Sequence, residues 1–216
     1  MAQRFTLHPT HPQPRLVRQV AAVVRSGGVI AYPTDSCYAL GCGLGDAEAT
    51  RRIRAIRGID ETHPLTLMLH DLAQLGHFAR LDNRQFRIVR QGVPGPYTFL
   101  LPATREVPRR LHQEKRSAVG FRVPSHPFVA ALVGELGEPL LSSTLTLVDE
   151  PEPLNDPDAI DERIGGFLDA IIDAGQSPAK PTTVVDLAVD PPAIVRLGLG
   201  DLARLGLAAT IRGESG

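Results

Sequence analysis

The sequence predicts a single α/β domain built on a twisted mixed sheet with helices packed against it. Short apolar runs alternate with amphipathic segments along the chain, which is typical of strands and helices that share one core. No repeat or linker divides the 216 residues, and 43% of them are hydrophobic. A chain of this length and composition can bury one substantial core. We therefore expect one domain over residues 1–216, with its core from about residue 12 to residue 207.

The first elements follow from caps and apolar spacing. Residues 14–25 have the spacing of an amphipathic helix, with proline in the first turn and glycines after the end. Residues 29–33 form an apolar run closed by proline, which is typical of a short buried strand. The stretch 34–45 is expected to leave that strand as a loop broken by glycines. Asp46 is expected to cap a helix over residues 47–57.

The same signals predict the remaining elements. Strands are expected at residues 65–69, 97–101, 117–123, 139–142, 169–173, 183–187 and 193–196. Helices are expected at residues 71–78, 83–91, 125–136 with Ser125 as the cap, 156–164 and 201–205. The proline-rich, acidic stretch 149–158 is predicted to be a surface connection.

The charge is unevenly distributed along the chain. Residues 51–122 contain 14 Lys+Arg and 6 Asp+Glu, a balance of +8, although the whole chain has a net charge of -1. A basic middle suggests a positive face that meets phosphate. Nearly all of these cations are arginines, whose planar fork suits phosphate and carboxylate oxygens.

Composition limits other classes of function. The two cysteines, Cys37 and Cys42, are expected to be small packed thiols, because a metal site needs more ligands at closer spacing. No apolar run reaches the roughly 18 residues of a membrane helix, and the start lacks a signal sequence. We expect a cytoplasmic protein that does not bind membranes.

Five segments of the chain closely resemble the YrdC/YciO family. They are YPTDS at 32–36 with YALG at 38–41, PGPYTF at 94–99, GFRVPSHP at 120–127, PLLSST at 139–144 and PTTVVD at 181–186. Residues 97–116 are similar to the YciO branch and not to the shorter YrdC form. The resemblance implies the YrdC-like fold, a mixed sheet with packed helices and a concave, basic cleft.

The resemblance also assigns roles near the first motif. Thr34 corresponds to a threonine that lies against the amino-acid substrate in the YrdC family. Arg57 matches the arginine of a Lys-x-Arg pair, although it could also simply cap its helix. The lysine of that pair is Ala55 here, and the adjacent Arg54 could replace part of its charge.

Two further positions differ from the family pattern. His63 stands where relatives have an asparagine that helps to hold nucleotide. Histidine can still donate a hydrogen bond, with a charge that depends on pH. Met68 stands where many relatives have a histidine that lines the substrate pocket, so a polar group is replaced by an apolar one.

Basic residues bracket the strand expected at 117–123. Lys115 and Arg116 precede it, and Arg122 lies inside the family match. Strand alternation places Arg116 and Arg122 on one side, where they would bind an anion or, alternatively, face solvent. Arg122 is the stronger candidate for a ligand contact.

Hydroxyls and one arginine complete the candidate site. Ser142, Thr144 and Thr146 lie two residues apart and align with a Ser-Thr-Ser-Ala-Asn pattern, in which Thr146 replaces the asparagine. Thr182 stands where relatives carry serine, and Arg196 matches a nucleotide-contacting arginine.

The activity that the resemblance implies is a nucleotidyltransferase-type synthesis. L-threonine, bicarbonate and ATP would be condensed into threonylcarbamoyl-AMP with release of pyrophosphate. The product would supply N6-threonylcarbamoyladenosine in tRNA, so downstream tRNA-modification proteins are candidate partners. ATP is expected as a substrate with Mg²⁺ on its phosphates, and no protein metal site is expected. The catalytic candidates are Arg57, Thr144 and Thr146.

Three alternatives stay open. A YciO-type paralogue would have weak or redirected carbamoyl-adenylate activity, because Ala55 and Thr146 depart from the family pattern. An RNA-binding protein would use the basic face for double-stranded RNA or tRNA without chemistry, with affinity that falls steeply with salt. A thiol hydrolase built on Cys37 is the most distant alternative.

Overall fold

A ten-stranded mixed sheet forms the centre of the protein, for which a computed structural model describes residues 2–111, 118–148, 150 and 152–207. The strands are β1 (Gln3–Thr6), β2 (Ile30–Tyr32), β3 (Ala39–Gly43), β4 (Thr66–Met68), β5 (Tyr97–Pro102), β6 (Ala118–Arg122), β7 (Leu140–Thr144), β8 (Ala170–Asp173), β9 (Thr183–Asp186) and β10 (Ala193–Arg196). Their order across the sheet is β1-β8-β2-β3-β7-β4-β6-β5-β9-β10.

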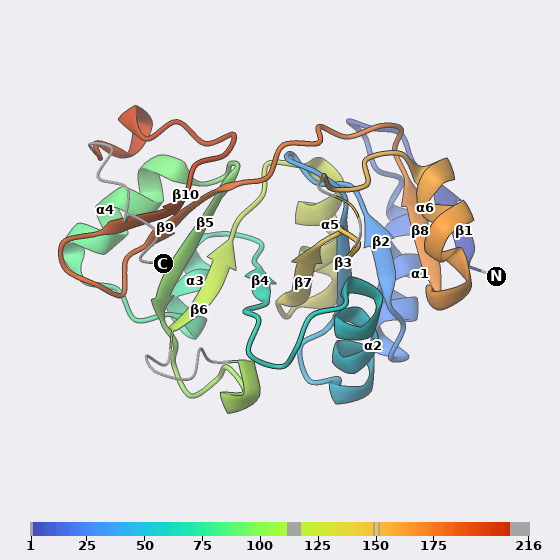
Figure 1. Cartoon of the computed structure of the whole chain (residues 1–216), viewed down its shortest axis with the longest axis horizontal. Coiled ribbons are helices and arrows are strands. Elements are labelled where there is room, and N and C mark those ends of the chain that lie inside the picture. The colour runs from blue at the N-terminus through green and yellow to red at the C-terminus, as the bar shows by residue number, and fades with distance from the viewer. Residues whose placement is uncertain (1, 112–117, 149, 151, 208–216) are drawn as a thin grey trace.

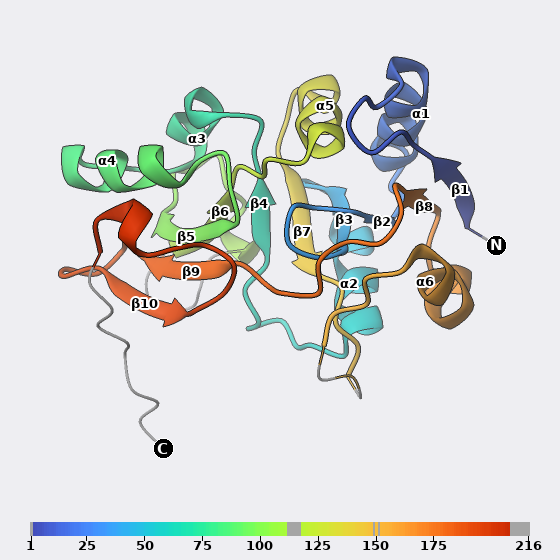
Figure 2. The ribbon, with the colours of Figure 1, turned by 90° about the horizontal axis from the view of Figure 1, so that it is seen from above.

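Helices pack around this sheet in two groups. They are α1 (Pro14–Arg25), α2 (Ala47–Arg57), α3 (Leu72–Phe78), α4 (Asn83–Gly92), α5 (Pro127–Leu136) and α6 (Pro157–Ile164), with short 3₁₀ turns at Arg109–Leu111, Gly165–Phe167 and Ala203–Leu205. Figure 1 shows α1, α2, α5 and α6 around the half of the sheet that holds β2, β3, β7 and β8, and α3 and α4 beside the half that holds β5, β6, β9 and β10. The connection from β8 to β9 crosses between the halves (Figure 2).

Strand alternation divides the core between the two faces of the sheet. The first core cluster joins side chains of α2, α3, α4 and α6 to one face of the sheet, including Leu67, Phe99 and Phe121. The second core cluster joins α1 and α5 to residues on the opposite face, including Met68 and Leu140. Among the described residues, the second core cluster includes none from β5, β6 or β9, so α1 and α5 do not cover this part of the second face. That uncovered part of the sheet is where the candidate site lies.

The predicted α/β fold is confirmed, and so are most of its elements. The helices expected at 14–25 and 47–57 have the expected bounds, and Asp46 and Gly58 cap the second as predicted. Asp71 likewise caps α3 through the backbone N–H of Gln74. No helix of the described residues is both long and apolar enough to span a bilayer.

The loop expected over residues 34–45 is wrong in its second half, because residues 39–43 form strand β3. This strand pairs antiparallel with both β2 and β7. Gly41, in the middle of this strand, is required by packing. A Cβ on Gly41 would lie 2.7 Å from the ring of Tyr32 and 2.9 Å from Leu140 Cδ2.

Two other differences concern the beginnings of elements. Strand β1 was not predicted, and it extends the sheet with residues that precede residue 12 by pairing with β8. The cap of α5 is His126, whose Nδ1 accepts a hydrogen bond from the Phe128 N–H at 3.3 Å. Ser125, the predicted cap, instead donates its hydroxyl to Asp35 at 2.9 Å.

Candidate active site

A pocket of about 980 Å³ opens on the uncovered face of the sheet. It brings together most of the residues singled out from the sequence. They are Arg57, His63, Met68, Arg122, Ser142, Thr144, Thr146, Thr182 and Arg196. Thr34 is not among the lining residues, and Lys115 and Arg116 lie outside the described residues.

Small side chains form the floor of the pocket. Thr66, Thr98 and Gly120 lie on neighbouring strands of the uncovered face and all line the pocket. A Cβ on Gly120 would lie 3.0 Å from Thr66 Oγ1 and 3.4 Å from Thr98 Cγ2. Glycine at position 120 therefore leaves the backbone of the pocket floor accessible to a ligand.

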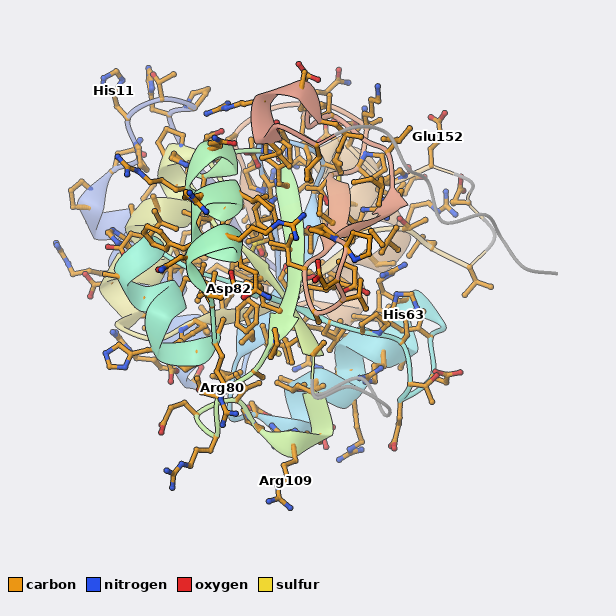
Figure 3. All side chains as sticks on the ribbon, turned by 90° about the vertical axis from the view of Figure 1, so that its left-hand side faces the viewer. His11, His63, Arg80, Asp82, Arg109 and Glu152 are labelled. Atoms are coloured by element: carbon orange, nitrogen blue, oxygen red, sulfur yellow. The ribbon has the colours of Figure 1, made fainter. Side chains whose placement is uncertain are left out.

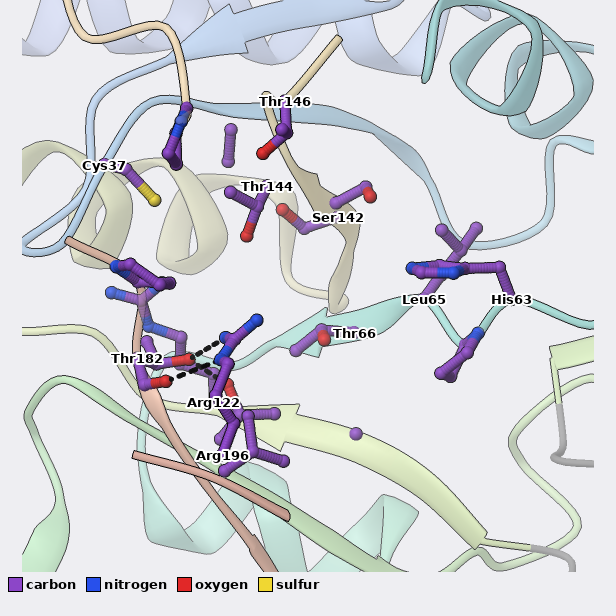
Figure 4. Close-up of a pocket in the computed structure, with 18 of the residues that line it drawn as sticks. Cys37, His63, Leu65, Thr66, Arg122, Ser142, Thr144, Thr146, Thr182 and Arg196 are labelled. Carbon is purple, nitrogen blue, oxygen red and sulfur yellow. Dashed lines mark hydrogen bonds between the residues drawn. The ribbon is translucent and has the colours of Figure 1, made fainter. Parts of the chain in front are cut away.

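Two walls face each other across this floor. Figure 4 shows Ser142, Thr144 and Thr146 on one side, and Thr182 and Arg196 on the other. The first wall comes from β7 and the residues after it, and the second from β10 and the residue directly before β9. Segments distant in sequence thus meet at one cavity, as the sequence predicts.

Arg122 is the most buried cation of the pocket, with 5% of its surface exposed. Its guanidinium forms an ion pair with Asp35, and Nη2 also donates to Thr34 Oγ1 at 3.3 Å. Asp35 in turn accepts hydrogen bonds from the N–H and hydroxyl of Ser125 at 3.0 and 2.9 Å. Nε of Arg122 is buried without a hydrogen-bond partner among the described residues.

The hydroxyl of Thr34 is used within its own turn. It donates to the carbonyl of Cys37 at 2.7 Å and accepts from the N–H groups of Ser36 and Cys37 at 3.1 and 3.2 Å. The side chain therefore stabilises the loop between β2 and β3 and the end of Arg122. The substrate contact expected for Thr34 stays a prediction.

Among the described residues, Arg57 and Arg196 hydrogen-bond only to neutral groups. Arg57 donates from Nε to the carbonyl of Thr146 at 3.0 Å and from Nη1 to Ser143 Oγ at 2.6 Å. Arg196 donates to the carbonyl and the hydroxyl of Thr182, both at 3.2 Å. Partial burial lowers the pKa of both guanidiniums, and the charge of Arg196 lowers that of Arg57 further. This part of the pocket therefore favours an anion.

Several hydroxyls of the pocket are already hydrogen-bonded. Ser142 Oγ donates to the carbonyl of Leu40 at 3.1 Å, so the hydroxyl of Tyr32, 2.6 Å away, is its donor. Thr98 and Thr182 share a hydrogen bond of 2.9 Å. These contacts fix the side chains before any ligand arrives.

Arg54 does not replace the missing lysine of the Lys-x-Arg pattern. It is buried and donates to the carbonyls of Asp60 and His63, so it holds the loop after α2. Neither Arg54 nor the exposed Ala55 lines the pocket. Partial burial and the charges of Arg57 and Arg54 lower the pKa of His63.

The pocket also contains residues that the sequence analysis did not assign. Lys180 lines it directly before the Pro181-Thr182 motif, a position that could have indicated its role. Glu152 is the one carboxylate among the described lining residues. Figure 3 shows Glu152 and His63 on the same side of the molecule, away from His11.

The chemistry of the lining side chains favours an anionic ligand over a reactive thiolate. Burial raises the pKa of the Cys37 thiol, which disfavours the nucleophilic thiolate that a hydrolase would need. Among the described residues, no group of three or more His, Cys, Asp or Glu is placed to hold a metal ion.

Comparisons with known proteins agree with this fold and site. The Sua5/YciO/YrdC family model, described as "Telomere recombination", matches residues 22–198. The chain is 48% identical over 202 residues to the uncharacterized protein YciO of Escherichia coli (strain K12), covering 94% of this chain and 98% of that protein. The crystal structure of E. coli YciO matches with a TM-score of 0.91 over 95% of this chain and 100% of that one.

Relatives named for an activity are more distant. A threonylcarbamoyl-AMP synthase of Chromobacterium violaceum is 40% identical over 137 residues, which cover 63% of this chain and 70% of that protein. The crystal structure of P. abyssi Sua5 complexed with L-threonine matches with a TM-score of 0.83 and 25% identity, over 91% of this chain and 58% of that one. The protein described here therefore belongs to the Sua5/YciO/YrdC family.

Proposed function

We propose that this pocket is the active site of a carbamoyl-adenylate synthase of the threonylcarbamoyl-AMP synthase type. Its substrates would be an amino acid, bicarbonate and MgATP, with L-threonine as the amino acid that the relatives suggest. The observation that carries the proposal is the convergence of Arg57, Arg122, Lys180 and Arg196 on one cavity with Glu152 as the one described carboxylate of its lining. Such an excess of positive charge fits a triphosphate beside a carboxylate.

The proposed reaction has two nucleophilic steps. The amine attacks the carbon of bicarbonate and gives a carbamate and water. An oxygen of the carbamate then attacks the α-phosphorus of ATP, and pyrophosphate leaves. Both steps bring anions together, so positioning and charge neutralisation carry most of the catalysis.

The arrangement of the pocket suggests a division of labour for these steps. Arg57 and Arg196, whose partners in the described part of the chain are neutral, are the groups proposed to neutralise the phosphates. Arg122, which lines the pocket, is proposed to receive a carboxylate oxygen of the amino acid. Thr144 at the end of β7 and Thr146 just after it are proposed to orient the adenylate. Mg²⁺ would arrive with ATP as part of the substrate.

Pyrophosphate release tests the proposal. The full chain is incubated with MgATP, bicarbonate and an amino-acid panel, and both pyrophosphate and the adenylate are measured. Release that needs both the amino acid and bicarbonate would support the proposal, and Arg57→Ala should lower it strongly. Arg18→Ala, an exposed arginine of α1 outside the lining, is the matched control. No release with any amino acid, together with salt-sensitive RNA binding that MgATP does not compete for, would favour an RNA-binding protein.

Two departures from the family pattern lead to a further test. Ala55 replaces the lysine of the Lys-x-Arg pair and Thr146 replaces an asparagine, and Thr146 lines the pocket. If the activity is that of the threonine enzymes in a weakened form, Ala55→Lys combined with Thr146→Asn should raise threonine-dependent turnover. An unchanged or lower turnover would show that the pocket is not a weakened threonine site.

A further inference from the structure

The hydroxyl of Ser143 lies against Arg57, one of the two pocket arginines that hydrogen-bond only to neutral groups of the described chain. Its oxygen accepts a hydrogen bond of 2.6 Å from Nη1 of Arg57. Both residues line the pocket. Ser143 is almost completely buried, with 7% of its surface exposed, whereas Arg57 is half-buried. The contact therefore places a buried hydroxyl beside a cation that a ligand can reach.

Strand alternation places Ser143 on the face of the sheet that α2 covers. Its neighbours Leu141 and Leu145 belong to the first core cluster, which α2 also joins. Pairing between β7 and β4 ends at Ser142, so β4 does not run beside Ser143. Arg57, the last residue of α2, and Ser143 both line the cavity. Next to the end of β7, the cavity therefore also reaches the face from which α2 supplies its arginine.

The hydroxyl of Ser143 still has a hydrogen to donate. A serine hydroxyl offers one donor hydrogen and two acceptor lone pairs. The bond from Arg57 uses one lone pair, and among the described residues this hydroxyl forms no other hydrogen bond. A hydroxyl that accepts from a cation becomes a stronger donor, because neighbouring hydrogen bonds polarise one another. An unused donor beside a cation suits an anionic oxygen.

The hydroxyl partner of Arg122 differs in this respect. Arg122 donates to the hydroxyl oxygen of Thr34 at 3.3 Å. The hydrogen of Thr34, however, is already donated to the carbonyl of Cys37 at 2.7 Å. The Thr34 hydroxyl thus stabilises its own turn, whereas that of Ser143 is available to a ligand.

We propose that Ser143 is a ligand-binding residue, which donates its hydroxyl hydrogen to the anionic oxygen that Arg57 binds. The inference rests on the carbamoyl-adenylate synthase activity proposed above and adds a residue to its anion site. The guanidinium and the hydroxyl would direct two donors to one anionic group. A phosphate oxygen of MgATP and a carboxylate oxygen of the amino acid have this chemistry in common, and titrations with each ligand distinguish them.

Calorimetric titration of the full chain with MgATP tests the proposal. Ser143→Ala should weaken binding by roughly 10- to 100-fold, since a hydrogen bond to a charged group is lost. Ser143→Thr keeps the hydroxyl and should keep most of the affinity. Ser26→Ala is the control, because Ser26 is exposed, lies outside the lining and donates to the carbonyl of Val23 at 2.8 Å.

A double variant distinguishes a direct contact from mere support of Arg57. If Ser143 only positions the guanidinium, Ser143→Ala has no effect once Arg57 is replaced. We expect instead that Ser143→Ala lowers the affinity of the Arg57→Met chain for the ligand again. An affinity that stays unchanged in this background would overturn the inference.

Two further titrations identify the acceptor. An equal loss of affinity for inorganic tripolyphosphate would assign the phosphates, and a loss confined to L-threonine, titrated into the MgATP-saturated chain, would assign the carboxylate. Unchanged affinity for all three ligands would overturn the inference. Pyrophosphate release tests the proposed function separately, so that function can fail while Ser143→Ala still weakens MgATP binding and supports the contact. Absence of MgATP binding by the unmodified chain would overturn both.

Discussion

The pocket contains two regions that differ in whether their arginines are paired with a carboxylate of the protein. At the end of β6, Arg122 is almost fully buried and is paired with the carboxylate of Asp35. Across the cavity, Arg57 and Arg196 are partly exposed and donate to carbonyls and hydroxyls of the described residues. Loss of hydration on burial is the main cause that lowers the pKa of both arginines. The charge of Arg196 lowers the pKa of Arg57 further, and the charge of Arg122 does the same for Arg196.

The charge of Arg122 is therefore compensated within the protein, whereas the charges of Arg57 and Arg196 are available to bind an anionic ligand. The Arg122–Asp35 pair joins the loop after β2 to the end of β6, so its loss should appear first in stability. Arg57 and Arg196 repel each other until an anion arrives, so their loss should appear first in binding. The following substitutions test that distinction.

The largest effect is expected from removing Asp35. Asp35→Ala leaves Arg122 buried without its counter-charge, which typically costs about 3–5 kcal/mol in the free energy of unfolding. Urea unfolding measures this loss. Asp158→Ala removes an exposed partner of Arg4 and should cost less than about 1 kcal/mol. The double variant Asp35→Leu/Arg122→Met should regain much of the stability, and a loss as large as in the single variant would contradict the assignment.

An intermediate effect is expected from replacing Arg57 or Arg196. Arg57→Met and Arg196→Met should each weaken MgATP binding by roughly 10- to 100-fold, since one charged hydrogen-bonding partner of the phosphates is lost. The free energy of unfolding should change by only about 1 kcal/mol or less. Calorimetric titration with MgATP measures the affinity, and Arg18→Met is the control. A large loss of stability with unchanged affinity would reverse the roles of the two regions.

The smallest effect concerns pH and His63. Its pKa is lowered by partial burial and by Arg57 and Arg54, so the imidazole is neutral at pH 7. A bound triphosphate would raise this pKa, so binding would take up a proton and MgATP affinity should rise as the pH falls from about 7.5 to about 6. The gain should stay below about tenfold. His63→Gln should bind MgATP with a flatter pH profile, and an affinity that falls with decreasing pH in the unmodified chain would contradict this coupling.

Local chemistry explains how much of the fold was predictable. Caps such as Asp46 and Asp71 act on N–H groups a few residues away, so the sequence alone reveals them. At Gly41 the local prediction is wrong, because this glycine is required by tertiary packing. It makes room for the side chains of Tyr32 and Leu140, whereas the local sequence alone suggests that the glycine interrupts the strand.

The site shows the same limit at longer range. Family motifs indicated Arg57, Arg122 and Arg196, but not how each charge is compensated. The Arg122–Asp35 pair joins residues 87 positions apart, and no local pattern links them. Arg54 lies three positions from Arg57 on the same helix but has a different role, because its guanidinium donates to the carbonyls of Asp60 and His63 in the loop after α2.

The path of the chain through the sheet has a consequence for the order of folding. The chain leaves one half of the sheet after β3, returns after β6 and leaves again after β8, and β9 completes the second wall by pairing with β5. These contacts join distant segments, and such contacts close late because they cost the most chain entropy. A chain that has assembled only its earlier strands would lack Thr182 and Arg196 at the cavity. Nucleotide binding is therefore a sensitive probe of whether newly made molecules have finished folding.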